Sequence, residues 1–202
     1  MKFYTVKAVI DHLVNLMDSS LNQSFDKKFY LSFYGGEPLL NMSLIKKTIT
    51  YVESLSIKYR RFSYGMTTNA VLLDKYMDYL VKNDFSLLIS LDGTFDNHSY
   101  RVFHNNKNSF KKVFGNVKLL MSKYPAFFER NVNFFSVLHN RNSVVEVKNF
   151  FKKEFNKTPT ISELNFSGIK KDKRKEFLEV FRNLKDSLSE VEDYESIADE
   201  LF

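Results

Sequence analysis

The sequence predicts an α/β fold, a partial (β/α) barrel of about five parallel strands. Segments with the apolar spacing of helices alternate along the 202-residue chain with short apolar runs typical of buried strands. This alternation favours βα units around a parallel sheet, and right-handed crossovers would place every helix on one face of a curling sheet. About five strands are too few for a closed barrel, and the chain opens on a helix. We therefore expect the first barrel strand to be missing or to be provided by another segment.

Six segments have the apolar spacing of amphipathic helices, and three of them begin at a capping residue. Asn41 and Ser109 precede two of these helices, and Ser143 with Glu146 has the pattern of a capping box. The last segment is expected to be one long terminal helix. The expected helices cover residues 6–17, 41–57, 73–80, 110–120, 143–155 and 177–188.

Five short segments rich in aromatic and aliphatic residues are expected to form the sheet. They cover residues 29–34, 62–68, 85–91, 132–138 and 162–169. A long polar loop is expected at residues 94–108, and the acidic end at 190–200 is expected to fray. These patterns divide the chain into a (β/α) core at residues 1–170 and a C-terminal helical extension at residues 171–202.

The composition excludes several classes of function. The chain has no cysteine, which rules out disulfides, thiolate nucleophiles and cysteine-bound zinc or iron–sulfur centres within these residues. His98, His104 and His139 lack the spacing of metal ligands, so no metal site is predicted. The net charge of +6 comes from basic pairs spread over the expected helices, which does not indicate a nucleic-acid partner. No apolar run is long enough to span a membrane and no signal peptide is visible, so we expect a cytoplasmic protein.

Two adjacent glycines follow the first expected strand. Gly35 and Gly36 have no Cβ, so the backbone there can come close to a ligand. Their amides and carbonyls, together with the Glu37 carboxylate, can bind a small polar group such as an amino-acid ammonium, and Pro38 stiffens the exit from the loop. A plain strand-to-helix turn explains the same four residues.

The ends of the next strands are also polar, and in parallel α/β folds ligands bind at the carboxyl ends of the strands. Thr68 ends one strand, and Asn69 after it is suited either to bind a ligand carboxylate or to cap a helix. Ser90 and Asp92 are suited to a pair of ribose hydroxyls, although Asp92 with the following glycine also fits a simple turn. Arg101 fits a bidentate carboxylate contact or an exposed loop arginine. The succession of such ends predicts a site for a polar small molecule.

Four motifs resemble, in the same order, landmarks of radical S-adenosylmethionine (radical SAM) enzymes. The chain is most similar to peptide and sulfatase maturases that carry a SPASM extension, in particular to Bacteroidales-type peptide maturases, and the resemblance runs from about residue 5 to about residue 180. The motifs are Gly-Gly-Glu-Pro-Leu-Leu at 35–40, Thr-Thr-Asn-Ala-Val-Leu-Leu-Asp at 67–74, Ser-Leu-Asp-Gly at 90–93 with His98 and Arg101 following, and Asn-Phe-Phe-Ser-Val-Leu-His-Asn-Arg-Asn at 133–142.

The resemblance implies S-adenosylmethionine as cofactor and a peptide or protein as substrate. It places Gly35, Gly36 and Glu37 at the methionyl amino group of the cofactor, and it adds contacts from Ser90 and Arg101. The expected cofactor-binding residues are Gly35, Gly36, Glu37, Pro38, Thr68, Asn69, Ser90, Asp92 and Arg101.

In radical SAM enzymes a CxxxCxxC loop binds a 4Fe–4S cluster that reduces the cofactor, and the released 5′-deoxyadenosyl radical removes a substrate hydrogen. This chain has no cysteine, so the resemblance implies that an upstream segment or a partner subunit carries that loop. We therefore expect the chain to be the middle portion of a radical SAM peptide maturase, truncated or split, and catalytically incompetent by itself.

Two other interpretations stay open. The chain also fits a non-catalytic, degenerate barrel that binds a peptide or nucleotide, or that docks on a partner supplying the missing strand. The remaining interpretation is an unrelated barrel enzyme for sugars or phosphates, with Glu37 and Asp92 as acid and base.

Overall fold

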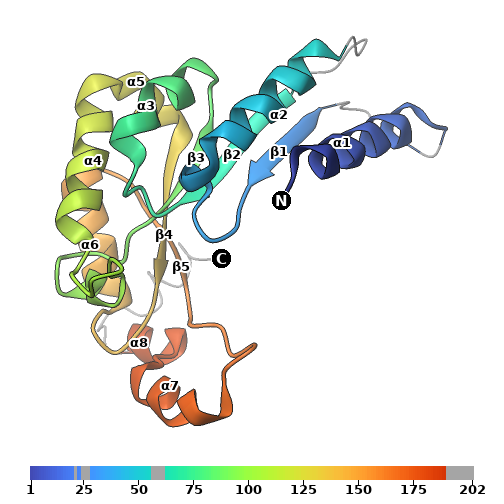
Figure 1. Ribbon diagram of the computed structural model, residues 1–202. Helices are drawn as coiled ribbons and strands as arrows, with labels where there is room; N and C mark the ends of the chain where they lie inside the picture. The colour runs from blue at the N-terminus through green and yellow to red at the C-terminus, as the bar shows by residue number, and fades with distance from the viewer. Residues whose placement is uncertain (21, 24–27, 56–61, 190–202) are drawn as a thin grey trace. The chain divides into compact units, whose positions relative to one another are not determined.

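The computed structural model shown in Figure 1 describes residues 1–20, 22–23, 28–55 and 62–189. Five strands form one sheet in the order β1-β2-β3-β4-β5, so strands consecutive in the sequence are neighbours in the sheet. β1 pairs with β2 and β4 pairs with β5, both in parallel. The predicted α/β class with about five parallel strands is confirmed. The strands are β1 (Phe29–Phe33), β2 (Phe62–Thr68), β3 (Ser86–Ser90), β4 (Val132–Val137) and β5 (Thr160–Ser162).

The chain divides into two compact units, which we describe separately. The first contains residues 1–68 and 72–87, and the second contains residues 69–71 and the chain from Leu88 onward. The first unit holds the helices α1 (Phe3–Asp18), η1 (Pro38–Asn41), α2 (Met42–Ser54) and α3 (Leu73–Lys82). The second holds η2 (Asn97–Tyr100), α4 (Phe110–Lys123), α5 (Pro125–Asn131), α6 (Val144–Phe155), η3 (Lys171–Lys173), α7 (Arg174–Val180) and α8 (Leu184–Ser189).

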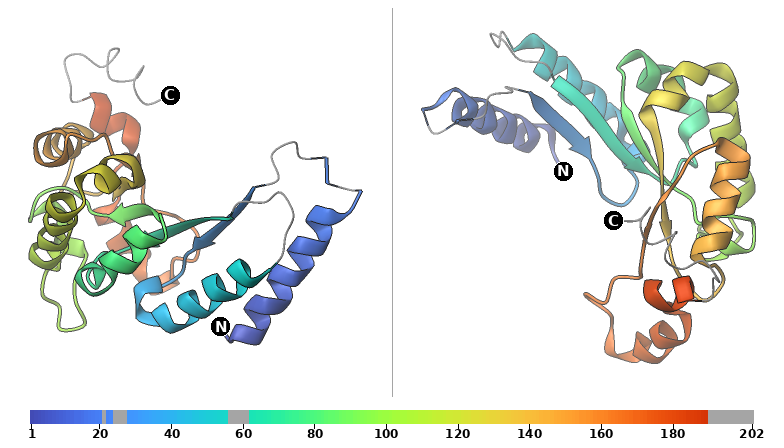
Figure 2. Two further views of the ribbon diagram at one scale, coloured as in Figure 1. Left: turned by 90° about the horizontal axis from the view of Figure 1, so that it is seen from above. Right: turned by 180° about the vertical axis from the view of Figure 1, so that it is seen from behind.

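In the first unit, β1 and β2 share an apolar face. Their parallel register sets Phe29 beside Phe62 and Phe33 beside Met66, and the rings of Phe29 and Phe62 stack with their centroids 5.3 Å apart. The Phe85 ring lies 6.0 Å from that of Phe33. Helices α1 and α2 lie side by side in both views of Figure 2. The buried apolar residues of the helices are Ile10, Leu39, Met42, Ile45, Ile49, Val52, Leu73, Met77 and Leu80.

The opposite face of the same strand pair carries polar side chains. Tyr30 and Ser32 of β1 point to this face, and both are exposed. A Cβ at Gly65 of β2 would overlap the Tyr30 hydroxyl, so the glycine makes room for the tyrosine ring to lie across the strand.

A cluster of phenylalanine rings joins the helices of the second unit. Lys118 of α4 forms an ion pair of 3.0 Å with Glu154 of α6, and its ammonium lies 5.2 Å from the Phe114 ring and 4.9 Å from the Phe155 ring, where a cation–π attraction operates. Rings from three helices and β4 therefore hold α4, α5 and α6 together. The cluster comprises Phe110, Phe114, Phe128, Phe134, Phe150, Phe151 and Phe155.

Two of the three predicted caps form as expected. The Asn41 side chain accepts a hydrogen bond of 3.3 Å from the Leu44 amide, and the Ser143 hydroxyl accepts one of 3.2 Å from the Glu146 amide. Ser109 stands at the N-cap position of α4 but makes no capping bond. Its hydroxyl donates instead to the carbonyl of Arg101, at 2.8 Å.

The last predicted strand is wrong except at its first residue. β5 covers Thr160–Ser162 rather than residues 162–169, and it is in register with Phe135, Ser136 and Val137 of β4. Because β4 ends at Val137, residues beyond Ser162 run past the end of the strand with which they would pair. The alternating apolar residues after Ser162 therefore form no strand, because β4 offers them no partner to pair with.

The predicted single helix at residues 177–188 is also wrong, because two short helices form. Phe181 between α7 and α8 has an extended backbone, with φ −62° and ψ 133°, and forms an antiparallel bridge with His139. The Asn140 amide donates to the Val180 carbonyl at 2.9 Å. These tertiary contacts interrupt the helix despite its regular apolar spacing.

Some expectations fall outside the described part or were incomplete. The predicted end of the second helix, at residues 56–57, and the acidic end at 190–200 lie outside the described residues. Helix α5, which Pro125 opens, was not predicted, and η2 lies inside the predicted loop at 94–108. In the described part of the chain, no helix combines the length and the apolar character needed to cross a membrane.

Candidate functional site

The Gly-Gly-Glu-Pro loop is anchored to the end of β2 within the first unit. One carboxylate oxygen of Glu37, Oε1, accepts hydrogen bonds from the Leu39 amide at 3.0 Å and from the Thr68 hydroxyl at 2.7 Å. Pro38 is the first residue of η1, whose Leu39 is fully buried. Glu37 therefore joins the carboxyl ends of β1 and β2, and Thr68, which is 2% exposed, fixes the position of that carboxylate.

The two glycines before Glu37 leave their backbone accessible. Gly35 has a φ of +139°, a value that side chains rarely allow, and both Gly35 and Gly36 are exposed. A Cβ added at either glycine would meet no atom within 4 Å, so the space beside this backbone is open. An accessible stretch of amides and carbonyls beside a fixed carboxylate suits an ammonium group with neighbouring polar atoms.

Asn69 closes a turn rather than capping a helix. Its side-chain oxygen accepts a hydrogen bond of 3.0 Å from the Val71 amide, whereas the N-cap position of α3 is occupied by Leu72. The buried side chain of Asn116 donates to the carbonyls of Ala70 and Val71, at 2.8 and 3.0 Å. The three-residue loop 69–71 is thus fastened to α4 of the second unit.

Asp92 and Arg101, which were predicted as separate cofactor contacts, bind each other in the second unit. Arg101 donates from Nε to Oδ2 at 2.6 Å and from Nη2 to Oδ1 at 2.8 Å, a bidentate pair. The Val137 amide donates to the same Oδ1 at 2.9 Å. The Asp92 side chain is 3% exposed and that of Arg101 is 28% exposed. Ser90, two residues before Asp92, is the last residue of β3 and is partly buried.

The fully buried side chain of His98 connects the backbone of Asp92 with that of Arg101 through hydrogen bonds. The Asp92 amide donates to Nδ1 of His98 at 3.4 Å, which leaves the ring proton on Nε2. Nε2 lies 3.0 Å from the Ser109 hydroxyl, which in turn donates to the Arg101 carbonyl. Burial lowers the pKa of His98 from 6.5 to about 4, with the positive charge of Arg101 acting in the same direction and Asp92 opposing it. His98 is therefore a neutral side chain with a structural role.

Two asparagines hold the adjoining loops in place. The Asn97 side chain accepts from the Thr94 amide at 3.0 Å and donates to the Arg141 carbonyl at 2.6 Å. The Asn142 side chain accepts from the His139 amide at 2.9 Å and donates to the Val137 carbonyl at 3.0 Å. The sequence placed Asn142 in a polar motif after a strand, but it predicted the bonds of neither asparagine, because a polar residue in a loop carries no sign of the distant backbone groups that it bonds.

The histidines differ in their environment. His98 and His139 are buried, and burial also lowers the pKa of His139. His104 is exposed. Among the described residues, no three histidine, aspartate or glutamate side chains gather as a metal site would require. Of the three histidines considered in the sequence analysis, the structure thus places His98 and His139 in the interior as hydrogen-bonding groups.

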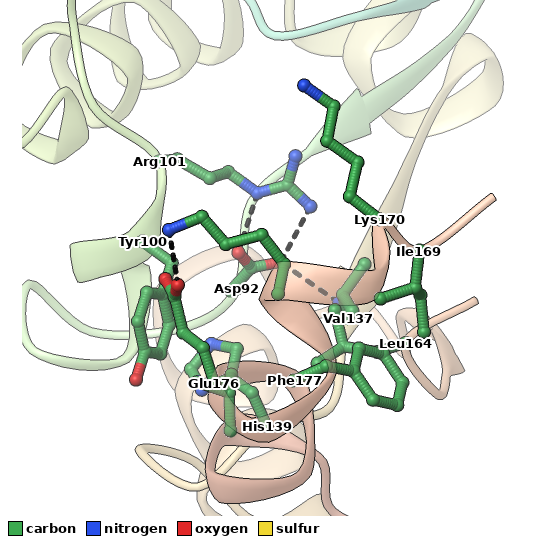
Figure 3. A pocket seen from close by; sticks show the side chains of 12 residues that line it. Asp92, Tyr100, Arg101, Val137, His139, Leu164, Ile169, Lys170, Glu176 and Phe177 are labelled. Carbon is green, nitrogen blue, oxygen red and sulfur yellow. Dashed lines mark hydrogen bonds and ion pairs between the residues drawn. The ribbon is translucent and has the colours of Figure 1, made fainter. Parts of the chain in front are cut away.

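A pocket of about 500 Å³ opens beside the Asp92–Arg101 pair within the second unit. Figure 3 shows Val137, Leu164, Ile169 and Phe177 gathered on one side of it, and Tyr100, His139 and Glu176 on the other. Both sides of the pocket therefore combine residues that follow β5 with residues at or after the carboxyl ends of β3 and β4. Its lining residues are Asp92, Tyr100, Arg101, Val137, His139, Leu164, Ile169, Lys170, Lys173, Glu176, Phe177 and Val180.

The family model of the radical SAM superfamily matches residues 9–153, which is more than half of the chain. The chain belongs to the radical SAM superfamily. The match covers all four motifs that resemble this superfamily in the sequence, from the Gly-Gly-Glu-Pro loop to residue 142. It also covers the residues of both hydrogen-bonded arrangements, Glu37 with Thr68 and Asp92 with Arg101.

Curated radical SAM relatives include two with assigned activities. A cysteine-type anaerobic sulfatase-maturating enzyme of Clostridium novyi (strain NT) is 28% identical over 149 residues, which are 70% of this chain and 38% of that protein. The radical SAM cyclopropyl synthase TigE of Paramaledivibacter caminithermalis is 24% identical over 126 residues, 61% of this chain and 26% of that protein. The chain thus spans well under half the length of these relatives.

Among solved structures, the protein anSMEcpe with bound AdoMet and a Cp18Cys peptide superposes with a TM-score of 0.67 at 20% identity. The superposition covers 80% of this chain and 42% of that one. At this level of identity the likeness concerns the fold, and it confirms the predicted partial barrel of the radical SAM type.

Proposed function

We propose that this chain is the middle portion of a radical SAM enzyme that modifies a ribosomally made peptide or protein. The observation that carries the proposal is the accessible Gly35–Gly36 backbone beside a fixed Glu37 carboxylate, in a chain of this superfamily. The sulfatase-maturating relative and the peptide-bound solved structure support a peptide or protein substrate. In this proposal residues 1–170 belong to the core, and residues 171–202 form an extension of it.

S-adenosylmethionine fits the residues that are present. Gly35, Gly36 and Glu37 would hold its ammonium group, with Pro38 and Thr68 supporting the loop from either side. Asn69, Ser90, Asp92 and Arg101 complete the proposed set, with Arg101 held in place by Asp92. When bound, this cofactor supplies the group that removes a hydrogen atom from the substrate in this superfamily.

A 4Fe–4S cluster does not fit the residues of this chain. The sequence contains no cysteine, and the described residues contain no cluster of other metal-binding side chains. We propose that a polypeptide outside these 202 residues carries the CxxxCxxC ligands, either in the same protein or in a partner. The chain by itself would then bind the cofactor without cleaving it.

Calorimetric titration of the full chain with S-adenosylmethionine tests the cofactor site. Glu37→Gln should weaken binding by about tenfold, because it removes the charge that faces the ammonium group while keeping the side chain's size. Glu53→Gln, at an exposed position of α2, is the matched control and should leave the affinity unchanged. Equal affinities for Glu37→Gln and the unaltered chain would refute the assignment.

The same protein tests the second half of the proposal. After anaerobic incubation with iron, sulfide and a reductant, the chain alone should release no methionine from S-adenosylmethionine. Reductive cleavage by the isolated chain would contradict the requirement for outside ligands. The alternative function, a non-catalytic peptide-binding module, is supported by the apolar pocket of the second unit, and it predicts peptide binding without any cofactor binding.

A further inference from the structure

The pocket of the second unit combines an apolar wall with an uneven distribution of charge. Val137 from β4 and three residues that follow β5, namely Leu164, Ile169 and Phe177, form that wall in Figure 3. The pocket volume of about 500 Å³ exceeds that of any single amino-acid side chain. The pocket thus has room for an apolar side chain together with part of its backbone and a neighbour.

The charged groups around the pocket neutralise one another except at one residue. Arg101 pairs with Asp92 at 2.6 Å, and Lys173 pairs with Glu176 at 2.7 Å. Burial lowers the pKa of His139, so its ring is neutral at neutral pH. Among the described residues, Lys170 is the lining cation whose side chain has no ion pair or hydrogen bond. The pocket therefore presents one uncompensated positive charge beside an apolar wall.

We propose that this pocket is the substrate subsite for a peptide in which an apolar residue directly precedes or follows an aspartate or glutamate. The apolar side chain would pack against Phe177, Leu164 and Ile169, and the carboxylate would pair with Lys170. This inference rests on the proposed function in taking the occupant to be the peptide substrate. Arg101, a proposed cofactor contact, is itself one of the residues that line the pocket.

Fluorescence anisotropy with labelled peptides tests this directly on the full 202-residue chain. Three acetylated hexapeptides serve as probes: a glycine–serine host with Leu-Asp at its centre, the same host with Leu-Lys, and the same host with Ala-Asp. The Leu-Asp peptide should bind about two- to fivefold more tightly than the Leu-Lys peptide, the range expected for a partly exposed ion pair. It should bind about tenfold more tightly than the Ala-Asp peptide, because less apolar surface is buried.

A charge swap makes the test specific for Lys170. Lys170→Glu should reverse the preference, so that the Leu-Lys peptide binds more tightly than the Leu-Asp peptide. Lys171→Glu is the matched control: it changes the same charge one residue away, at an exposed position that does not line the pocket, and should leave the preference as it is. Both residues are exposed, so neither substitution removes a buried contact.

The outcomes separate the two proposals. A Leu-Asp preference that Lys170→Glu reverses supports the subsite whether or not S-adenosylmethionine binds, and without cofactor binding it favours the peptide-binding module. Equal binding of the three peptides, or a preference that Lys171→Glu alters as much as Lys170→Glu, overturns the subsite. If the subsite is overturned but the chain still binds S-adenosylmethionine, the proposed radical SAM function stands.

Discussion

At the scale of single residues, Gly93 shows why the turn after Asp92 needs a glycine. Its φ is +117°, and a Cβ at this position would lie 2.7 Å from the side-chain oxygen of Asn97. Asn97 is not free to move aside, because it accepts from Thr94 and donates to the Arg141 carbonyl. The turn and the loop that follows it can therefore adopt this conformation only because Gly93 has no Cβ.

Gly93→Ala should lower the free energy of unfolding by about 1–3 kcal/mol, because the new Cβ strains the backbone and collides with Asn97. Gly115→Ala in α4 is the contrasting control. Gly115 is exposed and has open space around it, so this change should raise stability by about 0.5–1 kcal/mol through helix propensity. Urea unfolding of both variants measures the difference, and equal effects would contradict the strain argument.

At the scale of residues, the sequence indicated which positions cluster at strand ends but not how they bond. Glu37, Thr68 and Asp92 lie at or just after strand ends, as parallel strands predict, whereas Arg101 directly follows η2. The sequence did not predict that Arg101 pairs with Asp92, because each of the two side chains is also suited to contact a ligand. His98 gave no signal of its burial, since its neighbours in the sequence are polar.

At the scale of elements, α6 begins with the clearest local signal in the chain. The Ser143 hydroxyl accepts from the Glu146 amide at 3.2 Å and lies 3.1 Å from the Glu146 carboxylate. The helix ends at Phe155, and Asn156 after it adopts a left-handed conformation with φ 52° and donates its amide to the Lys152 carbonyl at 3.1 Å. Both ends of α6 are therefore fixed by short-range bonds.

Ser143→Ala should destabilise the chain by about 1 kcal/mol, because it leaves the Glu146 amide without its capping partner. Ser122→Ala near the end of α4 provides the control. The Ser122 hydroxyl donates to the Leu119 carbonyl on an exposed helix face, so its loss should change stability by less than about 0.5 kcal/mol. Thermal unfolding compares the two, and an equal shift in both would argue against the cap.

The elements that sequence reasoning misjudged are those decided by distant partners. The apolar alternation at 162–169 favoured a strand, yet β4 ends at Val137 and offers no edge there. The apolar spacing at 177–188 favoured one helix, yet the bridge between Phe181 and His139 breaks it. Helices α1 to α3 were predictable because their apolar spacing is a local property, and α2 is also capped locally by Asn41.

At the scale of the whole molecule, two buried histidines make stability depend on pH. The pKa of His98 is about 4 in the folded chain and about 6.5 when unfolded, so the unfolded chain binds the proton first as pH falls. The stabilisation is complete above about pH 6.5 and is lost progressively toward pH 4. His139, whose pKa is also lowered, acts in the same direction.

Urea unfolding should therefore show a loss of about 2 kcal/mol from His98 alone between pH 7.5 and pH 5. His98→Gln should flatten this dependence even though it lowers the stability at pH 7.5. His104→Gln, at an exposed position, should leave the dependence unchanged. A stability that is constant over this pH range in the unaltered chain would show that the buried rings are protonated as easily as free histidine.

The bidentate contact between Arg101 and Asp92 limits how this arginine can meet an anion. A guanidinium grips a carboxylate most firmly through two parallel N–H bonds, and Arg101 has already committed Nε and Nη2 to Asp92. What remains for an incoming ligand is the end of the guanidinium, where Nη1 and the second N–H of Nη2 can donate, but the charge of this group is largely balanced by Asp92. Arg101 would steer the ligand's orientation more than it would strengthen the ligand's attachment.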